Sequence, residues 1–419
     1  MAEKLKIVWL VNILFPKASE ILGLPKSVIG GWLYSYKVAL KQYYPQIELH
    51  IISPYAGKFP QFLGSEENDY YYVFPFSMHE KKLKRWFLGI NKRINPHIVH
   101  IYGSEYIHSS IYVKACGSTN VVLSIQGMIS VYAQYFYGGI EKKELNTYST
   151  FRDILKRETI QKGQNTFYRN GQAEIWLIKQ INNIIGRTSW DYANSWSLNS
   201  SLHYYKCEEA LRGSFYTHQW SINKCHRHTI FISQAHYPIK GLHKMLEALP
   251  IILKSYPDTR IYITGDDPTL KPWYRRTGYW NYLKYIIDKL KIRNHLNFLG
   301  RLSEEEMVIQ YLSANVFVCP SIIENSSNSV CEAQILGTPV IASYVGGMMD
   351  LIDDGKSGFL YRFEETALLA KKVCEIFEND NLACQLSINA RSIAAQRHNR
   401  ENIANTLYAI YLDIMNRTK

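Results

Sequence analysis

The sequence lacks the cysteine pattern of a disulfide framework or of a structural zinc site. Its 7 cysteines are an odd number, and none of them forms a C-x-x-C pair. Disulfide-stapled domains and zinc ribbons or fingers need paired cysteines at defined spacings. We therefore exclude both classes and expect a reducing compartment.

Long apolar runs are missing as well. No segment approaches the ~18 uninterrupted apolar residues that a transmembrane helix requires. The apolar stretch over residues 7–15 is interrupted by Asn12 and is followed by no small-residue cleavage site, so we interpret it as a buried strand rather than a signal peptide. We expect a cytoplasmic protein that is soluble or at most peripheral on the inner face of the membrane.

Acidic residues are scarce relative to basic ones. The chain has 36 Asp and Glu against 48 Lys and Arg, which gives a formal charge of +12 at pH 7. An apolar content of 47% excludes a disordered chain. The 419 residues exceed the roughly 250 to 300 at which a single core stops growing. This length predicts two domains. We find no internal repeat and no low-complexity linker between them.

Short apolar, β-rich runs alternate with longer helical patterns along the chain. The expected strands of the first half are residues 6–11, 48–52, 71–74, 97–101, 121–125 and 183–186. Those of the second half are residues 229–233, 260–264, 296–299, 316–319, 339–342 and 358–361. This alternation is typical of parallel sheets covered by helices on both faces. We predict an α/β protein with two doubly wound, Rossmann-like domains that face each other across a cleft.

A polar, turn-rich stretch over residues 217–227 is the expected hinge. It divides the chain into an N-terminal domain over 1–220 and a C-terminal domain over 221–395. A helix over 396–419 ends the chain and could cross back to the first domain. Ligands bind such sheets beyond the carboxyl ends of the strands, so the loops that follow strands are the expected functional positions.

One such loop carries two carboxylates. In the stretch PSIIENSSNSVCEAQILGTPVIAS, residues 320–343, a strand ends just before a polar loop with Glu324, and a helix begins near Ser327 or Asn328. Glu332 follows in the first turns of that helix. A carboxylate beside the positive end of a helix suits a ligand with a phosphate and a sugar.

A second loop carries a lysine. A strand ends near Ser233, and Lys240 and Gly241 then open an amphipathic helix. The apolar face of that helix contains Leu242, Met245, Leu246 and Leu249.

Together these motifs resemble those of the retaining GT-B glycosyltransferases of the large bacterial family 4, or group 1, type. Two Glu with seven residues between them, followed by Gly-Thr-Pro-Val-Ile-Ala-Ser and the Gly346-Gly347 turn, match the E-x7-E region of that family. The resemblance implies that Glu324 contacts the donor sugar, Glu332 binds the ribose, and Lys240 neutralises the diphosphate. Charge builds on that leaving group as the glycosidic bond breaks.

The resemblance extends to further donor contacts. It implies that the backbone after the first Glu holds diphosphate or sugar, here at Asn325, Ser326 and Ser327. A glycine-rich loop of the first domain is matched by Gly30 and Gly31. Many relatives carry an Arg where this chain has Gln234, so either Lys240 acts with the helix dipole alone or Arg301 supplies a second positive charge.

Three residues of the first domain are expected to contact the acceptor or the sugar. Gln126 stands where relatives often have a His, and we expect it to form hydrogen bonds. Arg187 and Asp191 follow the last strand of the domain; they either face the cleft or pair with each other.

The implied reaction moves a hexosyl group from a nucleotide diphosphate sugar to a glycan or lipid-linked glycan acceptor, with retention of configuration, in bacterial surface polysaccharide synthesis. No metal and no other cofactor is expected, because the His and Cys residues match no zinc spacing. The alternatives are a non-catalytic nucleotide-sugar-binding protein and a GT-B nucleotide-sugar epimerase.

Residues 80–93 form a strongly basic segment with interleaved apolar residues. Its cations are Lys81, Lys82, Lys84, Arg85, Lys92 and Arg93. The segment is either a helix with a solvated basic face or a patch for an anionic membrane surface. No recognisable nucleic-acid-binding module accompanies it, so we expect no nucleic-acid partner.

Overall fold

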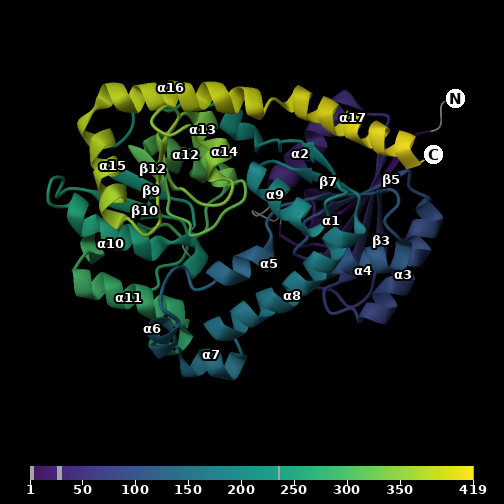
Figure 1. The fold of residues 1–419 in the computed structure, drawn as a ribbon, viewed down its shortest axis with the longest axis horizontal. Coiled ribbons are helices and arrows are strands. Elements are labelled where there is room, and N and C mark those ends of the chain that lie inside the picture. The colour runs from purple at the N-terminus through teal and green to yellow at the C-terminus, as the bar shows by residue number, and fades with distance from the viewer. Residues whose placement is uncertain (1–3, 26–30, 235, 419) are drawn as a thin grey trace. The chain divides into compact units, whose positions relative to one another are not determined.

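The computed structural model describes residues 4–25, 31–234 and 236–418. These residues form two compact units (Figure 1). The first comprises the described residues up to 130, together with 169–211 and those from 398 onward. The second comprises 131–168 and 212–397.

The first unit is built on a sheet with the strand order β3-β4-β2-β1-β5-β6-β7-β8. All neighbouring strands are parallel except β3 and β4. The strands are β1 (Lys6–Leu10), β2 (Glu48–Tyr55), β3 (Gln61–Glu66), β4 (Asp69–Pro75), β5 (Ile98–Tyr102), β6 (Val121–Ser124), β7 (Asn183–Gly186) and β8 (His203–Lys206). Every predicted strand of the first half is confirmed, and β3 and β8, at the two edges, were not predicted.

Helices surround this sheet. They are α1 (Pro16–Ile21), α2 (Gly31–Tyr43), α3 (Glu80–Ile94), α4 (Ile107–Cys116), α9 (Ser189–Leu198) and α17 (Arg400–Thr418), with α5 (Ile129–Tyr132) and α8 (Ile160–Gln180) at the boundaries with the second unit. Helix α17 packs against α2 (Figure 1). The hydroxyl of its Tyr411 accepts a hydrogen bond from Trp9 Nε1 of β1 at 3.0 Å and contacts His100 Nδ1 of β5 at 2.7 Å.

The second unit has a fully parallel sheet with the order β11-β10-β9-β12-β13-β14. Its strands are β9 (Thr229–Ile232), β10 (Arg260–Ile263), β11 (Leu296–Phe298), β12 (Val316–Cys319), β13 (Val340–Ser343) and β14 (Phe359–Tyr361). All six predicted strands of the second half are confirmed. Strands β12, β13 and β14 are buried throughout and read as nearly continuous apolar runs, because both faces of such a sheet are buried.

The second unit also contains the following helices. They are α6 (Lys142–Thr147), α7 (Phe151–Lys156), α10 (Leu242–Ile252), α11 (Gly278–Leu290), α12 (Glu304–Ser313), α13 (Asn328–Leu336), α14 (Met348–Leu351), α15 (Thr366–Glu378) and α16 (Asp380–Arg397). Ile230 and Ile232 of β9 lie in one core cluster with Leu246 of α10. The intervening Phe231 packs on Tyr311 of α12, with ring centroids 4.9 Å apart.

The boundaries of the units differ from the predicted ones. Residues 131–168, which we expected in the first domain, lie in the second unit. Their Tyr137 and Leu145 belong to the core of that unit, and the carbonyl oxygen of Gly138 lies 2.9 Å from Nε2 of the buried His243. This contact joins residues 105 positions apart, and local sequence patterns do not signal it.

No helix in the described ranges is long and apolar enough to cross a membrane.

Candidate functional site

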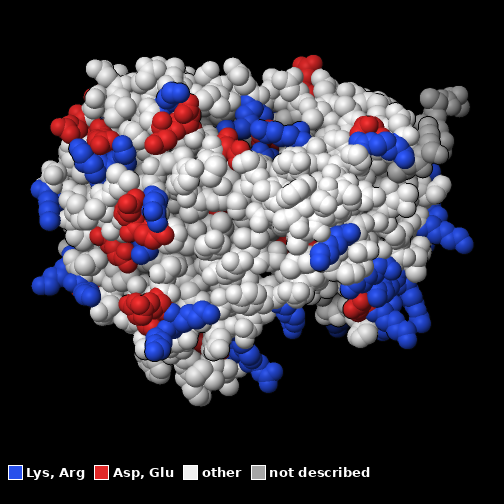
Figure 2. All heavy atoms as spheres, in the orientation of Figure 1, with Lys and Arg blue, Asp and Glu red and all other residues white. Residues whose placement is uncertain are grey.

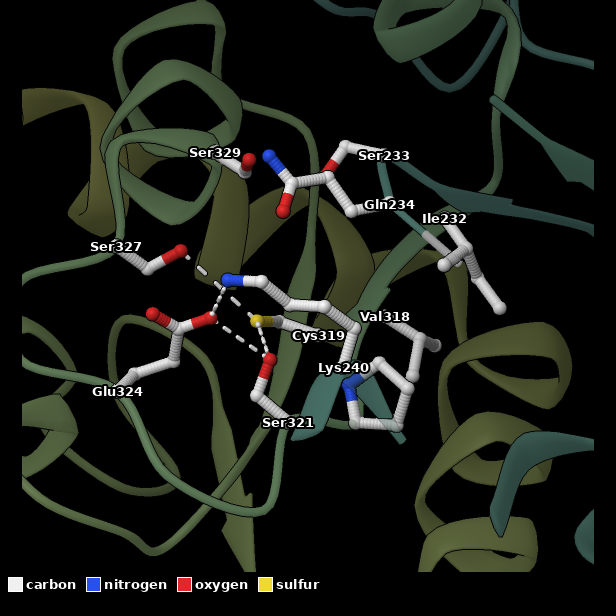
Figure 3. Close-up of a pocket in the computed structure, with 11 residues that line it drawn as sticks. Ile232, Ser233, Gln234, Lys240, Val318, Cys319, Ser321, Glu324, Ser327 and Ser329 are labelled. Atoms are coloured by element: carbon white, nitrogen blue, oxygen red, sulfur yellow. Dashed lines mark hydrogen bonds and ion pairs between the residues drawn. The ribbon is translucent and has the colours of Figure 1, made fainter. Parts of the chain in front are cut away.

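A polar pocket lies at the carboxyl ends of β9 and β12 (Figure 3). Lys240 Nζ, from the loop after β9, donates a hydrogen bond to Glu324 Oε1 at 2.5 Å. Ser321 Oγ donates to the same oxygen at 2.8 Å. The side chains of Lys240 and Glu324 are only 17% and 11% exposed. The structure thus brings together the lysine and the first carboxylate singled out in the sequence.

The charge of Lys240 is maintained by its partner. Burial disfavours the ammonium form, but the negative charge of Glu324, together with Tyr237, outweighs that effect and raises the pKa of Lys240 above its ordinary value. The pocket therefore contains a fixed cation at neutral pH.

Two glycines allow the loops of this pocket to approach each other. Gly241 has φ +69°, and a Cβ there would lie 1.8 Å from the carbonyl oxygen of Pro320. Gly346 has φ +54°, and its Cβ would lie 1.8 Å from the carbonyl oxygen of Glu324. The same oxygen accepts a hydrogen bond from Gly347 N at 3.1 Å. The glycines of both motifs are needed because neighbouring backbone occupies the place of a side chain.

The N-terminus of α13 faces the same pocket. Ser327 is its N-cap residue, but the Ser327 side chain forms no capping hydrogen bond. Ser327 and Ser329 line the pocket with Lys240. Asn325, Ser326 and Ser327 are all buried, and Ser326 Oγ has no hydrogen-bond partner among the described residues. A helix N-terminus and a buried cation together favour an anionic ligand.

The second carboxylate of the motif lies about one turn further along α13. Glu332 Oε1 accepts a hydrogen bond from Arg212 Nε at 3.0 Å and pairs with its Nη2 at 2.8 Å. Glu332 Oε2 has a longer contact, at 3.5 Å, with the Tyr311 hydroxyl. Burial raises the pKa of Glu332, although Arg212 acts in the opposite direction. No motif in the sequence indicated Arg212.

The other predicted donor contacts are distributed more widely. Gln234 lines the pocket and is exposed. Arg301 is exposed but does not line the pocket. Gly31 is the first residue of α2, in the first unit, whereas Gly30 lies outside the described residues.

Two of the residues expected to contact the acceptor or the sugar, Gln126 and Arg187, both contact Glu209 in the first unit. Gln126 Nε2 donates to Glu209 Oε1 at 2.6 Å, and Arg187 Nη1 pairs with Glu209 Oε2 at 2.7 Å. Arg187 and Glu209 line a small pocket that also contains Tyr36 and Cys207. Glu209 was not predicted, because it follows β8, an edge strand that the sequence pattern did not indicate.

Asp191 has a local structural role. Its Oδ2 accepts hydrogen bonds from the backbone N–H groups of Arg187 at 3.0 Å and Thr188 at 3.3 Å, and Thr188 completes a capping box for α9. Asp191 therefore contacts the backbone of Arg187, while the Arg187 guanidinium pairs with Glu209.

Among the residues that the structure describes, no three His, Cys, Asp or Glu side chains are grouped so that they could hold a metal ion.

Comparison with known families gives a match within the second unit. Residues 217–393 match the family model described as Glycosyl transferases group 1. The chain carries a group 1 glycosyltransferase domain. This domain contains Lys240, Glu324 and Glu332, and the resemblance inferred from their motifs is confirmed at the level of the family.

Curated relatives match mainly over the group 1 domain. The alpha-monoglucosyldiacylglycerol synthase of Acholeplasma laidlawii is 29% identical over 178 residues, which are 42% of this chain and 42% of the relative. The D-inositol 3-phosphate glycosyltransferase of Corynebacterium urealyticum is 30% identical over 175 residues, 41% of this chain and 40% of the relative. The match thus spans about two fifths of the length of these relatives.

Solved structures resemble the chain over almost its whole length. The sucrose-phosphate synthase from Thermosynechococcus elongatus has a TM-score of 0.71 at 12% identity, covering 99% of this chain and 100% of that one. HepE from Anabaena, in complex with UDP-glucose, has a TM-score of 0.68 at 15% identity, covering 96% of this chain and 99% of that one. The group 1 domain and the first unit together have the GT-B fold, which confirms the predicted fold class.

Proposed function

We propose that this protein transfers a hexosyl group from a nucleoside diphosphate sugar to a glycan or lipid-linked glycan acceptor, with retention of configuration, in the synthesis of a bacterial surface polysaccharide. The observation that carries the proposal is the Lys240–Glu324 pair beside the N-terminus of α13, inside the group 1 domain. A relative of the same fold, HepE, has been solved with UDP-glucose, which supports this class of donor.

The pair would exchange partners when the donor binds. Without donor, Lys240 and Glu324 neutralise each other at 2.5 Å. The donor brings a diphosphate, which gives Lys240 an anionic partner, and sugar hydroxyls, which donate hydrogen bonds to the Glu324 carboxylate. Lys240 and the α13 N-terminus would stabilise the charge that develops on the departing diphosphate.

Glu332 would bind the ribose of the nucleotide. Arg212 contacts Oε1 of Glu332, with Nη2 at 2.8 Å and Nε at 3.0 Å. Among the described residues, the other oxygen, Oε2, has only the 3.5 Å contact with the Tyr311 hydroxyl. A vicinal pair of hydroxyls can therefore donate to Oε2 while Arg212 holds the carboxylate in position. On this basis Arg212 is a positioning residue rather than a catalytic one.

The acceptor would bind at the first unit. Gln126, Arg187 and Glu209 form a linked set of donors and acceptors at the carboxyl ends of β6 and β7, which suits a ligand rich in hydroxyls. Retention in this family is commonly drawn as attack on the face from which the leaving group departs, without a protein nucleophile.

Nucleotide release tests the proposal most directly. Purified protein is incubated with UDP-, GDP- and ADP-sugars in turn, in the presence of chelator, and the freed nucleotide is measured. We expect release with one donor class, and Lys240→Met should lower the rate by at least about 100-fold, as for loss of a group that stabilises developing charge. Lys244→Met is the matched control, because Lys244 lies on α10 and pairs with Glu247 at 3.2 Å.

Two outcomes would refute the assignment. One is an undiminished rate in Lys240→Met; the other is nucleotide binding that appears only after Mg²⁺ or Mn²⁺ is added. Binding without release of any nucleotide would favour the alternative of a non-catalytic nucleotide-sugar-binding protein, which the departures at Gln126 and Gln234 from the family pattern suggest. The anomeric configuration of the product, read by NMR, tests retention separately.

The acceptor of such an enzyme is often anchored in a membrane, and α3 would bring the first unit to an anionic surface. Its apolar side chains Leu83, Phe87 and Ile90 are buried. Its exposed cations are Lys81, Lys82, Arg85, Lys92 and Arg93. Lys84 pairs with Glu80 at 2.8 Å. Figure 2 shows the resulting group of Lys and Arg side chains over α3. Such a surface is attracted to anionic headgroups and released by salt.

A further inference from the structure

The second unit exposes a cluster of large apolar side chains on two segments, α7 and the loop that follows β10. We call this cluster the apolar tip. Its members and their exposed fractions are Phe151 (74%), Ile154 (63%), Leu155 (72%), Leu270 (77%), Trp273 (71%) and Tyr274 (54%). Scattered apolar residues are normal on a protein surface, but large ones gathered on adjoining segments mark an interaction surface.

The two segments of the tip are fixed to each other by buried polar contacts. Asp153 of α7 is 2% exposed, and its Oδ2 accepts hydrogen bonds from Gly278 N at 2.8 Å and Thr150 N at 3.1 Å. Thr150 Oγ1 donates to the carbonyl oxygen of Arg276 at 3.2 Å. These hydrogen bonds hold α7 against the 264–277 loop, and the apolar side chains of both segments remain exposed to solvent.

The spacing within α7 gives the tip one apolar face. Phe151, Ile154 and Leu155 stand at positions i, i+3 and i+4, which lie on the same side of a helix. The indole of Trp273 and the ring of Phe151 line a common open groove. Aromatic and aliphatic side chains on adjoining surfaces form a continuous patch that water solvates poorly.

Cations surround the apolar tip. Lys156, Arg157 and Arg275 are exposed, and none of them forms an ion pair with a described residue. In Figure 2 the surface over α7, at the bottom of the view, is white, and Lys and Arg side chains lie at its margins together with a group of Asp and Glu at the lower left.

Nearby acidic groups have partners of their own. Glu158 pairs with Arg152 at 2.9 Å, and Asp266 pairs with Lys271 at 2.6 Å. The uncompensated charge around the tip is therefore positive.

We propose that the apolar tip inserts into an anionic lipid bilayer, with its aromatic and aliphatic side chains in the boundary between headgroups and acyl chains and its cations on the headgroups. This combination of one apolar face and a basic margin is the signature of an interfacial membrane segment. A second copy of the chain fits less well, because a symmetric contact through this face would set the same cations against each other. The proposal depends neither on the transfer reaction nor on α3.

The test is co-sedimentation with vesicles, using phosphatidylglycerol-containing and pure phosphatidylcholine vesicles at low and at high salt. The variant combines Phe151→Ser, Leu155→Ser and Trp273→Ser. We expect wild-type binding to anionic vesicles to persist in part at high salt, because apolar insertion is not screened. The variant should partition at least about 100-fold more weakly, since burying one such side chain is worth roughly tenfold or more.

A matched control removes exposed apolar residues elsewhere in the same unit. Ile309→Ser with Ile388→Ser changes side chains that are 55% and 61% exposed but lie outside the tip, and should leave vesicle binding unchanged. Unchanged thermal unfolding midpoints establish that both variants are folded. If the triple variant has a lower thermal unfolding midpoint than the wild type, the single variant Leu155→Asp is tested by the same criteria. Leu155 is 72% exposed, so its replacement should disturb the fold little.

Equal sedimentation of wild type and variant would overturn the proposal. It would also be overturned if sedimentation velocity found the wild type dimeric and the variant monomeric while both bound vesicles equally, because the tip would then be a contact between copies. Neither result depends on nucleotide release, so failure of this inference and failure of the proposed function are distinguishable.

Discussion

The buried ion pair of the donor pocket provides a quantitative test. In Lys240→Met, Glu324 loses its partner at 2.5 Å and retains the Ser321 hydrogen bond at 2.8 Å. Removing one partner of a fully buried pair costs roughly 3–5 kcal/mol. The side chains of Lys240 and Glu324 are not fully buried, being 17% and 11% exposed, and Ser321 still donates to Glu324 in the variant. We therefore expect a smaller loss, about 2–3 kcal/mol, in the free energy of unfolding.

Urea unfolding measures this loss as a shift of the midpoint of about 1 M. The double variant Lys240→Met with Glu324→Gln should recover at least about 1 kcal/mol, because no uncompensated charge remains. Lys284→Met is the control, since Lys284 and Asp288 form an exposed pair worth about 0.5 kcal/mol or less. The pKa of Lys240 is raised in the folded protein, so the pair's contribution to the free energy of unfolding is fully present below the pKa of an unfolded lysine. That contribution is lost only as the pH rises through the pKa of the folded state. The difference in urea midpoint between wild type and Lys240→Met should therefore not vary near neutral pH.

Two results would refute this reasoning. Additive effects of the two substitutions would mean that the charges do not interact appreciably in solution. A shift for Lys284→Met as large as that for Lys240→Met would mean that burial does not distinguish the two pairs.

Three further predictions concern the donor pocket and α3. Glu332→Ala should weaken UDP binding in calorimetry by about 1.5–3 kcal/mol, whereas Glu324→Ala should leave it nearly intact and abolish transfer; equal effects would show that the roles are misassigned. Gly346→Ala should lower transfer strongly, since its Cβ would lie 1.8 Å from the Glu324 carbonyl oxygen, while Gly355→Ala, with φ +76° but nothing within 4 Å, serves as the control. Replacing the four basic residues of the first half of α3 by Gln should reduce sedimentation with anionic vesicles at low salt, at about 1 kcal/mol for each engaged charge. Equal sedimentation would identify α3 as a solvated face. The residues changed are Lys81, Lys82, Lys84 and Arg85.

The sequence predicted all six strands of the second sheet and missed the two edge strands of the first. Every missed strand belongs to the first unit: β3 and β8 lie at the two ends of its sheet and are largely exposed or half-buried. Each of these two edge strands pairs with one neighbour and buries little, so it needs no apolar run. Strand β14, at an edge of the second sheet, is buried and apolar, and the sequence indicated it. Strand β3 is also irregular, with a shift in register between Phe62 and Gly64.

The site was predictable only where its residues form compact motifs. Lys240 and Glu324 stand in short segments whose glycines and prolines fix the local backbone, so their neighbours in the sequence identify them. Arg212 reaches Glu332 from 120 residues away, and Glu209 reaches Gln126 from 83 residues away. Such contacts follow from tertiary packing, which no local pattern encodes. The transfer of residues 131–168 to the second unit has the same origin.

The contact between β1 and α17 has a consequence for how the protein is synthesised. Trp9 hydrogen-bonds to Tyr411, 402 residues later in the chain, and the described residues of the second unit end at 397. At roughly 5–20 residues per second, the ribosome needs about 20 to 80 s to supply that partner. Throughout this interval the face of α2 that receives α17 is uncovered and available to chaperones or to other nascent chains. A ribosome that stalls just before residue 400 would release a chain with a finished donor unit and an open first core.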